Sequence, residues 1–173
     1  MKIEEFKGAE PRFVLEKYFK GKTKAWGIVR DRFGSIKRQF VVDMVGRWEG
    51  KVLTLDEKFT YNDGEIDERV WKIRKLDENR YEGTAADVIG KASGTSHGNA
   101  LNWHYTLALE ISGRIWNVNF DDWMLLQPDG VVFNRAEMTK YGIRLGEISL
   151  FFKKDEPGGV AADSGAPMQA TAE

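Results

Sequence analysis

The segment Gly98–Trp123 has the clearest alternation of hydrophobic and polar residues in the chain. A period of two runs through Leu101–Ile111 and again through Arg114–Asp122, which predicts two half-buried β-strands. A two-residue turn at Ser112 and Gly113 would join them into a hairpin whose apolar faces coincide. The predicted partners are Trp103 with Asp122, Tyr105 with Phe120, Leu107 with Val118 and Leu109 with Trp116 on the apolar face, and His104 with Asp121 on the polar face.

Similar strand patterns follow one another closely through most of the chain. The predicted strands are 23–30, 36–48, 52–61, 65–74, 80–86, 88–95, 101–111, 114–122, 131–139 and 143–153. Short strands separated by glycine-containing turns are typical of an antiparallel sandwich or an up-and-down barrel. Because closure removes exposed sheet edges, we expect an all-β, antiparallel up-and-down β-barrel of about nine or ten strands.

Two further turns set the register of the predicted sheet. A three-residue loop ending at Gly64, with that glycine in the left-handed conformation, places Glu57 opposite Arg69 among apolar residues. A two-residue loop would instead oppose like charges, so we prefer the longer loop. A three-residue turn at 140–142 would place Arg144 opposite Met138 and Asn134 opposite Ile148, which adds polar groups to an apolar face.

The two ends of the chain differ from this pattern. Residues 1–20 carry hydrophobic side chains at mixed spacing, which indicates a short lead-in with a helical turn against the core. Residues 154–173 are rich in Ala, Gly, Ser and Pro and have little to bury, so a disordered tail is predicted there. We therefore expect a single domain over residues 1–153.

Composition narrows the classes of function. The chain has 173 residues, 42% of them hydrophobic and 12% aromatic, which is enough for one sizeable core. A formal charge of −1 gives no general attraction to nucleic acid. The absence of cysteine excludes disulfides and thiolate chemistry. The sequence shows neither a signal peptide nor a membrane-spanning segment, so the expected location is cytoplasmic, or periplasmic or membrane-anchored if a lipoprotein signal has been removed.

Five ordered motifs resemble an uncharacterised bacterial family known only as a domain of unknown function. They are Phe59–Gly64 with Arg69–Trp71, Tyr81–Gly90, Gly98–Leu101, Phe120–Met124 and Asn134–Gly142. Members of that family are often lipoproteins with an N-terminal signal and a lipid-bearing cysteine, and this chain has neither. A looser resemblance is to lipocalin-like (calycin) barrels that carry apolar ligands. The lipocalin Gly-X-Trp motif near the first strand is not met, so this second resemblance concerns architecture only.

Several catalytic and metal-binding arrangements can be excluded or disfavoured. Asp121 and Asp122 are consecutive strand residues and point to opposite faces, so they do not form a dyad without a bulge. His97 and His104 have no acidic partners at ligand spacing, and we predict neither a metal site nor a cofactor. The glycines near Lys91 do not have the spacing of a phosphate loop. No Gly-X-Ser-X-Gly motif is present.

The inward-facing aromatic and polar residues define a candidate ligand site inside the barrel. Its predicted members are Glu57, Arg69, Trp71, Trp103, Tyr105, Trp116, Phe120, Asp122, Asn134 and Arg144. A mostly apolar pocket with a few polar groups is the usual form of a small-molecule site. The first hypothesis is therefore non-catalytic binding of a hydrophobic ligand such as a fatty acid, with its head group on Arg69 or Arg144.

Two alternatives remain at this point. The protein could be an enzyme that acts on a lipid-like substrate with Glu57, Asp122 or His104 as acid or base. It could also be an interaction domain with a filled core. A hollow interior would favour either of the first two hypotheses over the third.

Overall fold

The computed structural model describes residues 1–155. A short 3-10 helix, η1 (Ile3–Phe6), and the helix α1 (Leu15–Phe19) precede ten strands. The strands are β1 (Gly21–Asp31), β2 (Ile36–Glu49), β3 (Val52–Tyr61), β4 (Ile66–Lys75), β5 (Arg80–Thr84), β6 (Ala92–His97), β7 (Ala100–Ile111), β8 (Arg114–Leu126), β9 (Val132–Lys140) and β10 (Ile143–Lys154).

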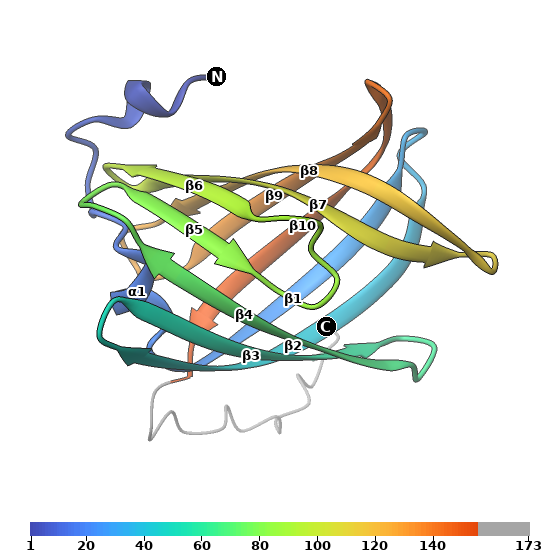
Figure 1. Cartoon of the computed structure of the whole chain (residues 1–173), viewed down its shortest axis with the longest axis horizontal. Coiled ribbons are helices and arrows are strands. Elements are labelled where there is room, and N and C mark those ends of the chain that lie inside the picture. The colour runs from blue at the N-terminus through green and yellow to red at the C-terminus, as the bar shows by residue number, and fades with distance from the viewer. Residues whose placement is uncertain (156–173) are drawn as a thin grey trace, which may run out of the picture.

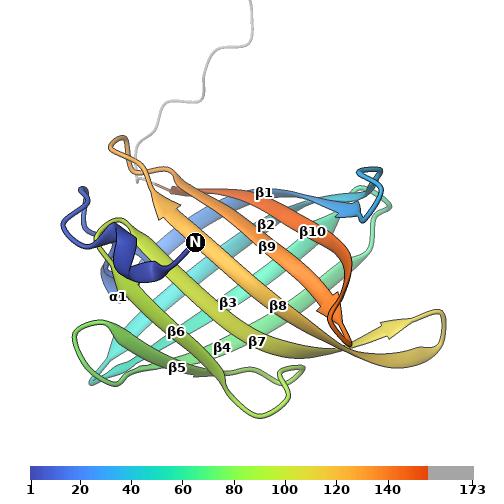
Figure 2. The ribbon, with the colours of Figure 1, turned by 90° about the horizontal axis from the view of Figure 1, so that it is seen from above.

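Each strand pairs with its neighbours in the sequence, and β10 pairs with β1 to close the barrel (Figures 1 and 2). The predicted closed, antiparallel, up-and-down barrel is confirmed. The largest differences in strand bounds are at β6, which begins at Ala92, and at β8, which continues to Leu126. The predicted tail lies outside the described residues except for Lys154, the last residue of β10, and Asp155.

The registers predicted for two hairpins are confirmed. In β7 and β8, Trp103 lies opposite Asp122 and Leu109 opposite Trp116. In β3 and β4, Glu57 lies opposite Arg69. Gly64, which closes that second hairpin, has a φ of 86°, the left-handed conformation that a three-residue loop needs.

The register predicted for the last hairpin is wrong. The turn contains two residues, Tyr141 and Gly142, and places Arg144 opposite Thr139. The register then shifts before Gly146, which lies opposite Met138, so Asn134 lies opposite Leu150. A Cβ atom on Gly146 would lie 2.2 Å from the carbonyl oxygen of Arg30 in β1. The absence of a side chain at Gly146, directly after the bulge, therefore lets β10 lie close to β1.

The segment before β1 covers one end of the barrel, as expected for a lead-in packed on the core (Figure 1). Phe13, Leu15 and Phe19 are buried there. The Tyr18 hydroxyl shares its one hydrogen between two carbonyl oxygens, that of Gly130 at 2.8 Å and that of Phe152 in β10 at 3.1 Å. Gly46 permits this docking, since a Cβ atom there would lie 1.8 Å from the carbonyl oxygen of Phe19.

Strand pairing around the barrel is shortest at β5 and β6. The ladder between β4 and β5 covers only Lys72 to Lys75 of β4, and the earlier residues of that strand continue past it. The loop 85–91 lies beside this stretch and binds β7 instead, for example through the amide of Ala108 and the carbonyl oxygen of Asp87 at 2.9 Å. A side-chain contact between Arg69 and Asp87 bridges the remaining gap.

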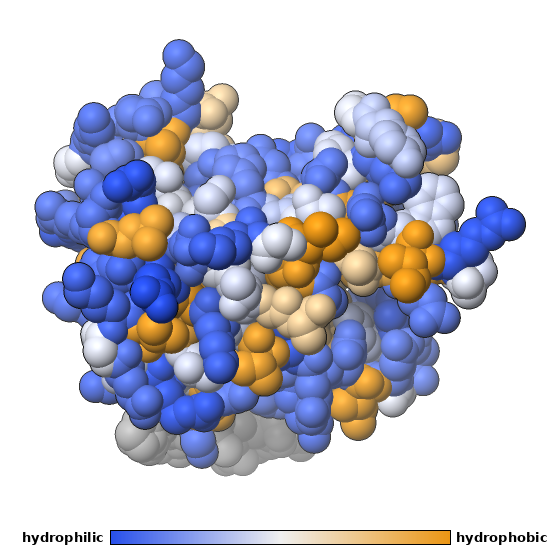
Figure 3. Space-filling view, viewed as in Figure 1, coloured by the Kyte–Doolittle hydropathy of each residue, from blue (hydrophilic) through white to orange (hydrophobic). Residues whose placement is uncertain are grey.

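The outer face of the molecule is mostly hydrophilic in the view of Figure 3, with separate hydrophobic patches. This agrees with the alternation along the strands, which sends every second side chain to water. Among the described residues, no helix has both the length and the apolar composition needed to cross a membrane.

Candidate functional site

The barrel encloses a cavity of about 120 Å³. Its lining residues come from β2, β3, β4, β7, β8, β9, β10 and α1: Leu15, Phe19, Phe40, Val42, Met44, Leu55, Glu57, Phe59, Arg69, Trp71, Ile73, Trp103, Tyr105, Asp122, Met124, Asn134, Ala136, Ile148, Leu150 and Phe152. Successive side chains of a strand point to opposite faces of the sheet, so every second residue of each strand points into the barrel.

The charged lining residues lie away from the α1 end of the cavity. On β3, Leu55 lies closer to the α1 end than Glu57, and on β4 Ile73 lies closer than Arg69. On β8, Met124 lies closer than Asp122. The cavity is therefore apolar beside α1, apart from Asn134 at the level of Met124. Its charged residues form a polar level farther along the barrel, and Phe40 and Phe59 lie beyond them.

Arg69 is the cation of the polar level, and Asp87 binds it from the loop 85–91. The Nε atom of Arg69 lies 3.1 Å from both carboxylate oxygens of Asp87, and a terminal nitrogen lies 2.7 Å from one of them. Glu57, directly opposite on β3, lies 3.9 Å from the other terminal nitrogen. Although burial opposes the charge, these two carboxylates raise the pKa of Arg69, so the guanidinium stays protonated.

Glu57 is a buried carboxyl group whose ion pair with Arg69 is long, at 3.9 Å. Burial is the main reason that its pKa rises from 4.5 to about 7. The charge of Arg69 acts in the opposite direction, but Asp87 and Asp122 partly cancel it. Glu57 therefore changes its protonation state near neutral pH.

Asp122 forms a second polar group on β8 and is only 6% exposed. It accepts hydrogen bonds from the amide of Asn134, a residue 1% exposed, and from the hydroxyl of Tyr105 at 3.3 Å. Burial raises the pKa of Asp122 from 3.8 to about 6, while the hydrogen bonds from Asn134 and Tyr105 limit the shift. Three carboxylates and one guanidinium thus lie in or beside the cavity.

Aromatic rings form much of the wall. The Trp71 ring contacts Trp103 and Tyr105 edge to face, with centroids 5.8 and 5.5 Å apart. Gly83 and Gly94 leave room for the Trp103 indole beside the wall, because Cβ atoms on them would lie 2.6 and 2.1 Å from the ring. The short strands β5 and β6 therefore give the cavity its width by lacking side chains at these points.

Seven of the ten predicted site residues line the cavity: Glu57, Arg69, Trp71, Trp103, Tyr105, Asp122 and Asn134. The other three do not. Phe120 stacks on Tyr105 at 4.9 Å within a separate cluster. Trp116 is 38% exposed. The Arg144 guanidinium lies 2.6 Å from the buried carboxylate of Glu147, on which Arg30 and Arg135 also converge, because the bulge changes the register of β10.

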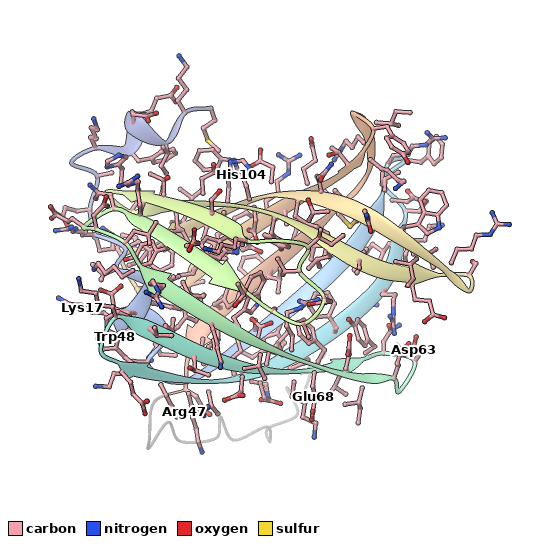
Figure 4. All side chains as sticks on the ribbon, in the orientation of Figure 1. Lys17, Arg47, Trp48, Asp63, Glu68 and His104 are labelled. Atoms are coloured by element: carbon pink, nitrogen blue, oxygen red, sulfur yellow. The ribbon has the colours of Figure 1, made fainter. Side chains whose placement is uncertain are left out.

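Asp87 is the member of the polar group that the sequence pattern did not indicate. It lies in a loop, where alternation predicts no side-chain direction, and only the resemblance motif Tyr81–Gly90 included it. His104 lies outside the barrel, 3.5 Å from Asp121, and is therefore separated from the cavity (Figure 4). The predicted separation of Asp121 from Asp122 is also present, since Asp121 is exposed and Asp122 is buried.

The site has no evident place for a metal ion. Among residues 1–155, no group of three or more His, Asp or Glu side chains has the arrangement of a metal site. The chemistry available inside the cavity is therefore that of buried carboxyl groups, one guanidinium, an amide and aromatic rings.

The comparisons with known proteins agree with this architecture. An S-type phycobiliprotein lyase, CPES from Guillardia theta, has a similar structure, with a TM-score of 0.61 at 10% sequence identity over 91% of this chain and 95% of the lyase. At this identity, the likeness concerns the fold alone. No curated protein matches the chain. Residues 1–154 match the model of a family described as a protein of unknown function, DUF3833. Because that match spans nearly the whole chain, the protein belongs to the DUF3833 family.

Proposed function

We propose that this protein binds a small, mainly apolar molecule inside its barrel without transforming it. The observation that carries the proposal is the internal cavity, which is apolar beside α1 and polar beside Glu57, Arg69 and Asp122. Apolar pockets with a few polar groups are the usual binding sites for small molecules. Glu57 and Asp122 are buried in this cavity without an ion pair of hydrogen-bond length, and such groups are costly to retain inside a protein.

The size of the cavity limits what it accommodates. Its volume of about 120 Å³ is close to the roughly 150 Å³ of an apolar cavity that takes up one benzene molecule. A larger ligand therefore has to displace side chains. Met44 and Met124 line the cavity, and methionine changes conformation easily.

The fatty acid expected from the sequence has no free cation to bind in this arrangement. Arg144 lies outside the cavity on Glu147, and Arg69 is already bound to Asp87. A ligand carboxylate would lie beside Glu57 and Asp122, where like charges repel each other. We therefore favour a ligand whose polar group is neutral or donates hydrogen bonds.

Benzyl alcohol is a suitable first probe, because its ring fits the volume and its hydroxyl can bind a carboxylate. We expect saturable shifts of the indole N–H signals of Trp71 and Trp103 in two-dimensional nitrogen–proton NMR spectra. The signals of Trp26 and Trp116, which are exposed, provide internal controls.

A matched pair of variants tests whether binding occurs in the cavity. Ala136→Leu adds volume to a buried lining residue and should abolish the shifts. Ser93→Leu adds the same side chain at an exposed position of β6 and should preserve them. Wild-type shifts that persist unchanged in Ala136→Leu would refute binding in the cavity, and a wild type without shifts would count against the proposed function.

A second function, acid–base catalysis, is favoured by the pKa of about 7 at Glu57. A carboxyl group that titrates near neutral pH inside a cavity is suited to proton transfer. Incubation with candidate esters and enol ethers, followed by mass spectrometry, tests this function. Turnover by the wild type and its loss in Glu57→Gln would favour an enzyme over a binding protein, and no turnover by the wild type would count against it.

A further inference from the structure

We infer that the ligand of this cavity is a small organic cation, a protonated amine carried on an apolar body. The inference rests on the proposed function, because it names the class of ligand for the same cavity. Its basis is the arrangement of charges and rings around the cavity, in which carboxylates outnumber cations and the cation present is already bound.

The first step concerns the charges at the polar level. Glu57 and Asp122 line the cavity and Asp87 lies beside it, whereas Arg69 is the only Lys or Arg among the lining residues. Asp87 occupies the Nε atom and one terminal nitrogen of Arg69. An arriving anion would therefore meet two further carboxyl groups and a guanidinium whose strongest partner is in place.

The second step concerns the acceptors that remain. Glu57 is 3.9 Å from Arg69, which is beyond hydrogen-bond distance, and its side chain is 12% exposed. Asp122 receives one bond from Asn134 and a longer one of 3.3 Å from Tyr105. A carboxylate can accept about four hydrogen bonds, so both groups have capacity for an ammonium donor.

The third step concerns the aromatic wall. Trp71, Trp103, Tyr105 and Phe59 line the same cavity as the two carboxyl groups. Phe59 already faces a cation, with the Arg69 guanidinium 5.4 Å from its ring centroid. Cations are attracted to the faces of such rings, most strongly when they are removed from water. Rings and carboxylates together form a site for a desolvated ammonium group.

The neighbouring cation at the β1–β2 end of the barrel does not change this balance. Arg38 lies 3.5 Å from the ring centroid of Tyr61 and contacts Asp63 at 2.9 Å and Glu65 at 2.8 Å. Arg38 thus has two carboxylate partners of its own and does not offer a free cation to a ligand of the cavity.

Three probes with the same ring and different charges test the inference at pH 8. Benzylamine carries a positive charge there, benzyl alcohol is neutral and benzoate is negative. Titrations followed by NMR should show benzylamine binding at least about tenfold more tightly than benzoate, a difference of about 1.4 kcal/mol, with benzyl alcohol between them. Because Glu57 is largely ionised at this pH, the full charge difference is available.

Two variants with matched controls locate the preference. Glu57→Gln should reduce the ratio of benzylamine to benzyl alcohol affinity several-fold, and Asp122→Asn should act in the same direction. Asp56→Asn and Asp121→Asn alter neighbouring residues on the outer face and should leave the ratio unchanged. Circular dichroism spectra establish that each variant is folded.

The outcomes separate this inference from the proposed function. If benzyl alcohol binds, and benzoate binds as tightly as benzylamine or more tightly, the cation preference is overturned and the binding function is kept. A ratio that is the same in Glu57→Gln and Asp122→Asn as in the wild type would also overturn it. Failure of all three probes to bind would instead overturn the proposed function.

Discussion

Glu57 and Asp122 couple the stability of the barrel to pH. Their pKa values in the folded protein are about 7 and about 6, against ordinary values of 4.5 and 3.8. Between the ordinary and the folded value, the folded state keeps a proton that the unfolded state has released. The free energy of unfolding therefore falls as the pH rises through this interval, by roughly 3 kcal/mol for Glu57 alone.

This prediction is tested by urea unfolding at several pH values between 5 and 8. Carboxyl groups with lowered pKa values, such as Glu16 and Glu147, act in the opposite sense, but their effect is complete above about pH 5. We expect the wild type to lose stability from pH 5 to pH 7 and Glu57→Gln to lose much less. A wild-type stability that rises across this range would contradict the assignment.

Arg69 is the residue whose removal should cost most in the polar level. Arg69→Met leaves Glu57 and Asp87 without their cation, and such breaks in buried ion pairs cost roughly 3 kcal/mol. Arg47→Met removes an exposed pair with Asp56 and should cost less than about 1 kcal/mol. Chemical denaturation at pH 8 compares the two variants, and equal losses would mean that Arg69 is not an internal anchor.

The elements of this fold differ in how far their residues determine them locally. The β7–β8 hairpin could be predicted in detail because its alternation is strict and its turn contains two residues. The bulge in β10 could not, because it lies beside a close contact between Gly146 and Arg30, a residue far away in the chain. The sequence of helix α1 shows no clear helical period of hydrophobic residues. The helix packs against the end of the barrel and buries side chains on more than one of its faces.

The strands β5 and β6 make a prediction at the same scale. Gly94→Ala places a methyl group where the Trp103 indole now lies, so the ring must move into the cavity. We expect this variant to bind benzyl alcohol at least tenfold more weakly and to show altered tryptophan fluorescence. Ser93→Ala, at the neighbouring exposed position, should change neither property. Unchanged binding by Gly94→Ala would show that Trp103 has room elsewhere.

For the molecule as a whole, the barrel should open first where the pairing between neighbouring strands is shortest. The ladders from β4 to β5 and from β5 to β6 span four residue pairs each, whereas that from β7 to β8 spans twelve. Native-state hydrogen exchange should therefore be faster in β5 and β6 than in β7 and β8. Uniform exchange around the barrel would mean that it unfolds as one unit.

The overall shape and most of the cavity wall could be predicted because strand alternation determines which side chains point inward. The electrostatic character of the cavity could not. The strand pattern predicts Arg69 as a partner for an anionic head group, but Asp87 from the loop 85–91 binds it. A loop residue that contacts a nearby strand depends on the path of the folded chain, which hydrophobic periodicity does not encode.

The stretch of β4 that runs past β5 leaves a short length of backbone open to strand pairing. In other proteins, such lengths recruit strands from neighbouring copies and start aggregation. Here Asp67 and Glu68 are exposed at this position, and an approaching copy would bring the same negative charges. The negative charges of Asp67 and Glu68 thus oppose strand pairing between copies of the chain. The barrel can therefore keep this unpaired length of β4 beside its cavity without aggregating there.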